Sequence, residues 1–315
     1  MSRRILLLAS SVLLFAVSHE VSQETTAIAA SQEQKKVQRG RVPASVTVVR
    51  DIVYAKYGER EVQLDLYLPK EPARKPMPCV VVIHGGGWRS GDKQRFAPIA
   101  ARLAENGFAA VCIGYRLLPE VSFPAPVEDC KAAVRWVRAN ATKHDIDPDR
   151  IGAIGGSAGA HLAAMLATSH KAADLEGRGG NPGVSSRIQA TVAMATPADM
   201  TQFAQRSSIG DELAKLISPL THVDADSASI LLIHSNADKT VPFEQSERLQ
   251  AKYKEAGVRA ELVTIDGAPH AFWNSPQWFD DTLANAVKFF NDTLNSAKSQ
   301  SQRQRQQSGD VDNKR

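Results

Sequence analysis

The pentapeptide at 155–159, GGSAG, matches the pattern G-x-S-x-G and places Ser157 at its centre. It directly follows the apolar run Ile151–Ile154 and precedes a helix-forming stretch, AHLAAMLA. A sharp turn from a strand into a helix needs small residues around the serine, because its backbone is strained and its neighbours are crowded. The helix N-terminus then favours the negative charge that develops at the serine. The motif therefore predicts that Ser157 is a nucleophile, with a glycine-rich packing turn as the alternative.

A second glycine-rich segment, HGGGW at 84–88, directly follows another apolar run, CVVVI. Three consecutive glycines remove side chains from a turn and expose backbone N–H groups. Such donors can stabilise the oxyanion that forms when a nucleophile attacks a carbonyl group. A phosphate-binding loop is the alternative, but no Gly-Lys-Ser/Thr follows the glycines.

Two further polar side chains, Asp238 and His270, each lie just beyond a short apolar run. With Ser157 they follow the chain order Ser…Asp…His. The carboxyl ends of parallel strands share one edge of a sheet, which is where ligands bind in open α/β folds. We therefore expect the three residues to meet as nucleophile, acid and base. Asp199 and Asp266 are alternative acids, although Asp266 precedes the histidine too closely for an easy bend.

Other residues at the same edge are weaker candidates. Trp88, Tyr115 and Arg116 follow predicted strands and could line the acyl or alcohol pocket, with ordinary packing at the rim as the alternative. We expect Trp88 and Tyr115 to contact substrate. His161 falls on the helix after the serine and is expected to form a structural hydrogen bond.

The elements that must position these residues are short apolar runs alternating with helical stretches. Positions 46–55 and 61–68 predict a β-hairpin. Six further runs have the length of strands buried on both faces. The alternation predicts a mostly parallel, eight-stranded sheet covered by helices on both faces. The six strands are predicted at 79–83, 109–113, 151–154, 188–194, 230–233 and 260–265, and the helices around 95–106, 126–140, 158–169, 244–256 and 278–294.

Two segments, 171–186 and 200–228, interrupt this alternation. They are the candidates for an irregular loop and a small cap over the site. Both contain few large apolar side chains, whereas a long acyl chain needs a broad apolar lining. We therefore expect a short-acyl substrate.

Four motifs together resemble the HGGG-bearing esterases of the α/β-hydrolase superfamily. They are HGGGW at 84–88, GGSAG at 155–159, DKTVP at 238–242 and APH at 268–270. The sequence is most similar to bacterial acetyl and feruloyl esterases that act on plant-polysaccharide substituents, over about 46–294.

This resemblance implies the α/β-hydrolase fold and a serine carboxylic-ester hydrolase that needs no cofactor and no metal. The sequence departs from the pattern of such enzymes at two places. Ser235-Asn236 stands where they often have Gly-Asp before the acid, and Gly156 stands where the hormone-sensitive-lipase branch has the Asp of its GDSAG turn. The implied triad is Ser157, Asp238 and His270, and the implied oxyanion-hole donors are the backbone amides of Gly86, Gly87 and Ala158.

The expected substrate is a small-molecule or polysaccharide ester carrying an acetyl or feruloyl group. A serine exopeptidase and an arylformamidase are alternatives on the same fold, and an inactive hydrolase-fold binding module is an alternative of another class. No nucleic-acid partner is expected, because the 38 basic and 34 acidic residues are interleaved and give a net charge of only +4. The sequence leaves the oligomeric state open.

The N-terminus has the layout of a secretory signal peptide at 1–18. Arg3 and Arg4 precede an apolar run, Ile5–Val17, whose thirteen residues are too few to span a bilayer comfortably. We expect a secreted or periplasmic protein without stable membrane insertion after cleavage; an uncleaved anchor is the alternative. The remaining domain boundaries are a flexible leader at 19–45, a catalytic domain at 46–295 and a disordered tail at 296–315.

Three cysteines are too few for a disulfide scaffold and too scattered for a zinc site. Cys79 and Cys112 are expected on neighbouring strands but staggered by about three residues, or ~10 Å, which is beyond disulfide reach. We predict that these two and Cys130 are free thiols.

Overall fold

The computed structural model describes residues 42–203 and 209–295 of the chain. The predicted signal peptide, most of the predicted leader and the C-terminal tail lie outside these residues. Within the described ranges, no helix combines the length and the apolar character that crossing a bilayer requires.

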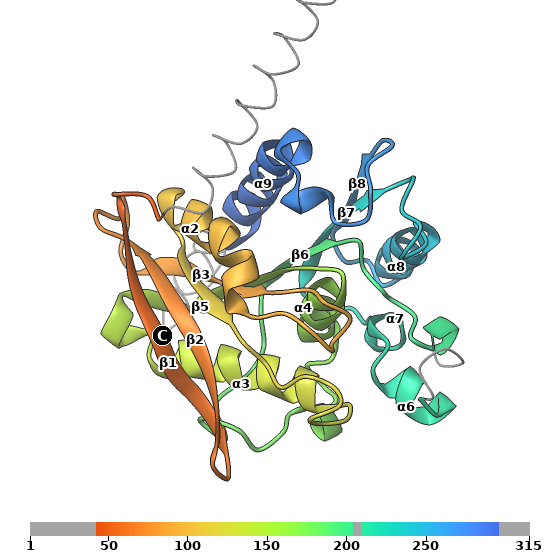
Figure 1. Ribbon diagram of the computed structural model, residues 1–315, viewed down its shortest axis with the longest axis horizontal. Helices are drawn as coiled ribbons and strands as arrows, with labels where there is room; N and C mark the ends of the chain where they lie inside the picture. Colours follow the sequence, from red (N-terminus) through yellow and green to blue (C-terminus); the bar gives the residue numbers. More distant parts are fainter. Residues whose placement is uncertain (1–41, 204–208, 296–315) are drawn as a thin grey trace, which may run out of the picture. The chain divides into compact units, whose positions relative to one another are not determined.

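The strands of the described chain form one sheet in the order β1-β2-β4-β3-β5-β6-β7-β8 (Figure 1). The first two form the predicted hairpin, β2 pairs antiparallel with β4, and all other pairs are parallel. The prediction of a mostly parallel, eight-stranded sheet is therefore confirmed. The strands are β1 (Val46–Tyr57), β2 (Arg60–Pro69), β3 (Met77–Ile83), β4 (Ala109–Ile113), β5 (Ile146–Gly156), β6 (Ala190–Met194), β7 (Ser229–Ser235) and β8 (Ala260–Ile265).

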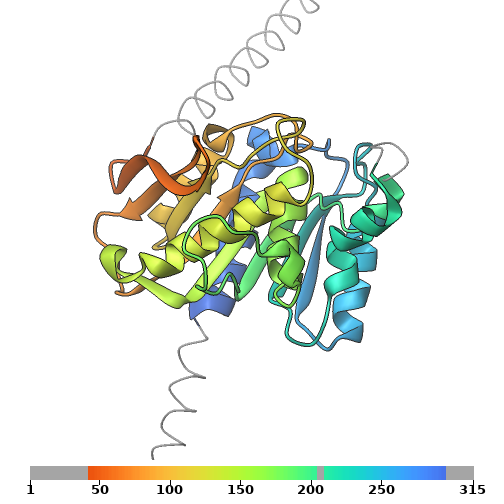
Figure 2. The same cartoon turned by 90° about the horizontal axis from the view of Figure 1, so that it is seen from below.

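Helices cover both faces of this sheet (Figure 2): α2 and α9 pack on one face, and α3, α4 and α8 on the other. The α-helices are α2 (Ala97–Glu105), α3 (Ala125–Ala139), α4 (Ala158–Thr168), α6 (Asp211–Leu216), α7 (Pro219–His222), α8 (Glu244–Glu255) and α9 (Pro276–Phe290). The short 3₁₀ and π turns are η1 (Lys93–Phe96), η2 (Thr142–His144), η3 (Ala173–Leu175), η4 (Phe272–Asn274) and η5 (Asn291–Asn295).

The central strands are buried along their whole length. Every residue of β3, β4 and β6 is buried, as a strand covered by helices on both faces requires. The three cysteines are buried and free. Cys79 pairs with Ala109 whereas Cys112 pairs with Val82, so the predicted stagger of three residues is present.

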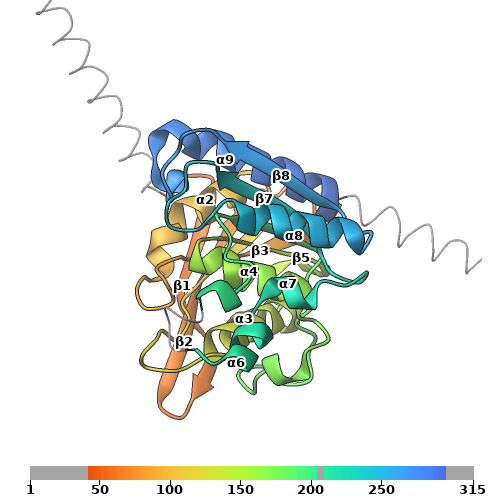
Figure 3. The ribbon, with the colours of Figure 1, turned by 90° about the vertical axis from the view of Figure 1, so that its right-hand side faces the viewer.

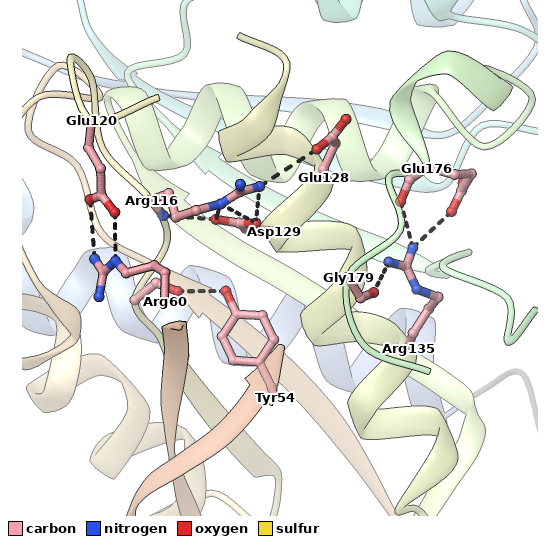
Figure 4. A network of polar contacts seen from close by, with 10 residues as sticks. Tyr54, Arg60, Arg116, Glu120, Glu128, Asp129, Arg135, Glu176 and Gly179 are labelled. Carbon is pink, nitrogen blue, oxygen red and sulfur yellow. Dashed lines mark hydrogen bonds and ion pairs between the residues drawn. The ribbon is translucent and has the colours of Figure 1, made fainter. Parts of the chain in front are cut away.

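The segment 171–186 lies at the opposite edge of the sheet from the predicted site, because it connects the end of α4 to the beginning of β6. Its anchors come from α3 (Figure 4). Arg135 donates hydrogen bonds to the Gly179 carbonyl at 2.5 Å and to the Glu176 carboxylate at 3.1 Å. This segment is therefore an irregular loop and does not wall the site.

The segment 200–228 leaves the sheet at the carboxyl end of β6 and contains α6 and α7. Figure 3 shows α7 between α4 and α8. This segment corresponds to the predicted small cap.

Candidate active site

Ser157 occupies the turn between β5, which ends at Gly156, and α4, which begins at Ala158. Its backbone has φ 55° and ψ −122°, which is an unfavourable conformation for a residue with a Cβ atom. The Ser157 amide donates a hydrogen bond to the Met194 carbonyl at 2.8 Å, which ties the turn to β6. The strained turn leaves the serine half-buried at the carboxyl edge of the sheet.

Three residues from three different loops form one hydrogen-bonded series. His270 Nδ1 lies 2.6 Å from Asp238 Oδ2, and His270 Nε2 lies 2.8 Å from Ser157 Oγ. An ionised carboxylate only accepts hydrogen bonds, so the imidazole proton is on Nδ1 and Nε2 is free to accept the serine hydroxyl proton. The structure thus brings together the three residues that the chain order predicted to meet.

The side chain of Asp238 is fully buried, and protein groups donate several hydrogen bonds to its carboxylate. Its Oδ1 accepts hydrogen bonds from the amides of Thr240 at 2.8 Å and Val241 at 3.0 Å. Burial by itself would raise the pKa of Asp238, but hydrogen bonds from His234, His270 and these amides outweigh it and hold the pKa well below its usual range. The carboxylate is therefore ionised at neutral pH.

His234 is a contact of the triad that sequence reasoning missed. Its Nε2 donates to the Val241 carbonyl at 3.1 Å and faces Asp238 Oδ2 at 3.3 Å. Its Nδ1 accepts from the Ser246 hydroxyl at 2.8 Å. The available signal was a histidine inside β7, four residues before the acid, but its orientation depends on how α8 packs against that strand.

The departure at Ser235-Asn236 has a structural explanation. The Ser235 hydroxyl donates to the Ala268 carbonyl at 2.6 Å, and Asn236 Oδ1 accepts from the Gly267 amide at 3.0 Å. Asn236 Nδ2 also donates to Asp266 at 2.8 Å. These bonds join the loop that carries the acid to the loop that carries the histidine. Asp266 is thus occupied in holding the loops together.

Asp199, the other alternative acid, has partners of its own. Its carboxylate forms an ion pair with Arg248 at 2.9 Å and accepts a hydrogen bond from the Thr201 amide at 3.0 Å. The carboxylate that contacts His270 is that of Asp238.

The HGGGW loop after β3 lies directly against the serine turn. A Cβ atom at Gly85 would lie 2.6 Å from the Gly156 carbonyl oxygen and 3.4 Å from Ser157 Cβ. Gly86 has φ 124°, and a Cβ atom there would lie 1.9 Å from the Ser90 carbonyl oxygen. In the first turn of α4, a Cβ atom at Gly159 would likewise lie 2.2 Å from the Ile83 carbonyl oxygen. Glycines on both sides therefore allow the start of the HGGGW loop to approach the serine turn this closely.

The second departure, Gly156, is explained by Trp273. A Cβ atom at Gly156 would lie 2.6 Å from the Trp273 ring, so the turn has no room for an aspartate. The same indole packs edge-on against the His270 imidazole at 5.7 Å between centroids. Trp273, which sequence reasoning also missed, thus supports the turn and the histidine from one side.

Two of the predicted pocket residues do not line the site. Tyr115 is only 4% exposed, because its ring stacks on the His84 imidazole and its hydroxyl donates to the His84 carbonyl at 3.0 Å. The prediction that Tyr115 contacts substrate is therefore wrong, and it instead packs beneath the HGGGW loop. Arg116 forms a bidentate pair with Asp129 (Figure 4). Its guanidinium also lies over the Tyr57 ring.

Trp88, the last residue of the HGGGW loop, is half-buried and packs against apolar side chains of the cap. Its Nε1 donates to His161 Nδ1 at 3.2 Å, and its ring meets Phe123 edge-on at 5.7 Å. His161 Nε2 donates to the Ile217 carbonyl at 2.7 Å, so His161 forms the hydrogen bonds expected of a structural histidine.

The burial of His161 has a measurable consequence for acid stability. Burial lowers the pKa of His161 to about 4, whereas the unfolded chain titrates this group near ~6.5. Between these values the unfolded state binds a proton that the folded state does not, so stability falls as the pH decreases. The loss is about 1.4 kcal/mol per pH unit, or on the order of 3 kcal/mol across the window.

We therefore expect the His161→Asn variant to be less stable than wild type at pH 7, with a stability gap that narrows towards pH 4. Urea unfolding of both proteins at several pH values measures this gap. A gap that is constant or widens in acid would contradict a neutral, buried His161.

Within the described residues, one group of side chains has metal-ligand chemistry: His170, Asp224 and Asp226. Lys171 Nζ lies 2.7 Å from each of the two carboxylates, so an ammonium group already pairs with both. The group lies after α4, at the edge of the sheet opposite Ser157.

The sheet order, the strained serine turn and the hydrogen-bonded Ser157, His270 and Asp238 define an α/β-hydrolase fold. The family model BD-FAE matches residues 64–253 of the chain. With Esterase LipQ of Mycobacterium tuberculosis (strain ATCC 25618 / H37Rv), the chain is 32% identical over 260 residues. This chain therefore belongs to the BD-FAE family of α/β-hydrolase esterases.

The match with LipQ covers 76% of this chain and 61% of LipQ, so the chain spans about three fifths of that relative's length. Two solved structures are similar over nearly their whole length. A truncated form of a carbohydrate esterase from gut microbiota has a TM-score of 0.68 and 32% identity, covering 78% of this chain and 95% of that one. The propionate-bound esterase Est2 of the planctomycete Thermogutta terrifontis has a TM-score of 0.70 and 31% identity, covering 79% and 94%.

Proposed function

We propose that this protein is a serine carboxylic-ester hydrolase for short-acyl esters, with acetyl or feruloyl groups on carbohydrate as the substrate class. The continuous series from Ser157 through His270 to Asp238, with contacts of 2.8 and 2.6 Å, carries this proposal. The esterase names of its relatives support the reaction, and the carbohydrate esterase at 32% identity supports the substrate class. The signal peptide predicted from the sequence supports an extracytoplasmic substrate.

In the proposed reaction, His270 Nε2 takes the hydroxyl proton while Ser157 Oγ attacks the ester carbonyl. Asp238 holds the imidazole in the required tautomer and stabilises the imidazolium. The alcohol leaves with the proton from His270, and an acyl-serine remains. Water then gives a proton to His270 and attacks the acyl group, which releases the acid and restores the serine.

The oxyanion of each tetrahedral intermediate is proposed to accept hydrogen bonds from the backbone amides of Gly86, Gly87 and Ala158. The close approach of the HGGGW loop to the serine turn supports this role. The amide of Ala158 begins α4, where the helix dipole also favours negative charge.

The preference for short acyl groups is supported by the small apolar surface of the cap. Two leucines of the cap pack into the interior: Leu216 packs against the main core cluster, and Leu220 packs against the cluster that includes Leu249 and Tyr253 of α8. The apolar cluster that remains consists of Phe123, Met200, Ala214 and Ile217, with Trp88, Leu118, Phe203, Ile209 and Leu213 packed against it. Four of these side chains are buried and five are only partly buried, so the small apolar surface that remains supports a wall for a short chain.

The test is a series of p-nitrophenyl esters together with acetylated xylan and methyl ferulate. We expect kcat/KM to fall by about tenfold or more from acetate to octanoate, because a small pocket excludes the longer chain, and the part left outside gains none of the ~0.8 kcal/mol available per buried CH₂. A maximum at octanoate would contradict the short-acyl preference. Failure to hydrolyse any ester, with no labelling by a fluorophosphonate probe, would favour the binding-module alternative.

A further inference from the structure

Trp88 has a backbone conformation that its side chain must help to maintain. It follows Gly87 directly and has φ 60°, in the left-handed region that residues with a Cβ atom rarely adopt. Its carbonyl accepts a hydrogen bond from the Leu118 amide at 2.8 Å. Its indole is held by the Nε1–H···Nδ1 bond to His161 at 3.2 Å and by edge contacts with His161 and Phe123.

His161 is itself fixed to the nucleophile. It lies one turn after Ser157 in α4, where its amide donates to the Ser157 carbonyl at 3.0 Å, and it is completely buried. Its Nε2 faces the carbonyl oxygen of Ile217, at the end of α6, at 2.7 Å. A carbonyl only accepts, so Nε2 carries the proton and Nδ1 has the lone pair that the Trp88 indole requires.

One neutral imidazole therefore connects the HGGGW loop, the helix that begins at the nucleophile, and the cap. Burial lowers the pKa of His161 to about 4, so this arrangement of protons persists at neutral pH. Loss of the Trp88 bond would release the side chain that holds the strained residue next to Gly86 and Gly87.

We propose that His161 is a positioning residue that, through Trp88, holds the oxyanion-binding amides of the HGGGW loop at a fixed distance from Ser157. The inference rests on the proposed ester hydrolysis, because the loop stabilises charge only if Ser157 attacks a carbonyl group. Its second bond, to Ile217, couples the same loop to the cap.

Two amide substitutions separate the two bonds of the imidazole. The His161→Asn variant places an amide oxygen near the Nδ1 position and keeps an acceptor for Trp88. The His161→Gln variant places an amide near the Nε2 position, so it keeps a donor for Ile217 and loses the acceptor. The Trp88→Phe variant removes the donor of the same hydrogen bond, the indole N–H. Because Trp88 is only half-buried, we expect the fold to tolerate this change.

With p-nitrophenyl acetate, we expect His161→Gln and Trp88→Phe to lower kcat by about 10- to 100-fold with little change in KM, because the displaced amides act mainly on the transition state. His161→Asn should recover most of the wild-type kcat. The Trp88→Phe/His161→Gln double variant should lose no more than either single variant, since both remove the same bond.

His222 provides the matched control, because its Nε2 bonds the Leu216 carbonyl at 2.7 Å in the same cap. His222→Asn removes a comparable bond to α6 without touching the HGGGW loop, so its kcat should equal that of wild type. Thermal denaturation of every variant separates a loss of positioning from a loss of folding.

The inference is overturned if His161→Gln and Trp88→Phe keep kcat within about twofold of wild type, or if the losses in the double variant multiply. It is also overturned if His161→Asn loses as much as His161→Gln. A readout without turnover is the indole N–H resonance of Trp88 among the four tryptophans, identified by its loss in Trp88→Phe. The chemical shift of this resonance should change in His161→Gln and remain at its wild-type value in His161→Asn, whether or not wild type hydrolyses an ester. If wild type hydrolyses no ester at all, that result would instead contradict the proposed function.

Discussion

Replacing Ser157 with alanine is expected to lower kcat by about 10⁴- to 10⁶-fold, because the members of a catalytic triad act as a unit. Without Oγ, His270 has no hydroxyl to deprotonate and no acyl-enzyme can form. Folding should be preserved, because alanine keeps the Cβ atom that serine carries at φ 55° and the amide still bonds the Met194 carbonyl. Steady-state hydrolysis of p-nitrophenyl acetate and thermal denaturation measure the two effects.

A matched control is Ser185→Ala, at an exposed serine in the loop on the opposite edge of the sheet. Its activity should equal that of wild type. If a folded Ser157→Ala variant retained more than a few per cent of wild-type activity, Ser157 would not be the nucleophile.

Replacing Asp238 with asparagine is expected to lower kcat by about 10⁴-fold. The asparagine amide can donate a hydrogen bond to Nδ1 of His270, which places the imidazole proton on Nε2 and leaves no lone pair facing Ser157. The variant also removes a carboxylate that is ionised at neutral pH and accepts hydrogen bonds from Thr240 and Val241. Measuring kcat between pH 6 and 9 tests whether any pH restores the activity.

The control for this variant is Asp199→Asn. Asp199 pairs with Arg248 at 2.9 Å, so its loss should change kcat little. The reverse ranking of the two variants would assign the acid to the loop after β6.

Much of the architecture could be predicted from local sequence patterns. A strand buried on both faces must be a short apolar run, and the CVVVI run belongs to β3, in which every residue is buried. Ser157, Asp238 and His270 each follow such a run, and parallel strands end at one edge. Chain order and strand direction therefore sufficed to predict that the three would meet. The same reasoning predicted the free cysteines, because strand register alone separates Cys79 from Cys112.

Tertiary structure alone decided which side chains surround these three residues. Tyr115 follows a strand as the triad residues do, but the His84 ring and carbonyl hold it in the interior. The indole of Trp88 meets an imidazole 73 residues further along the chain, and Trp273 fills the space above Gly156. Periodicity and motif spacing report strand and helix positions, because these depend on neighbouring residues. Contacts between side chains of different elements depend on how those elements pack, and no local pattern in this sequence encodes them.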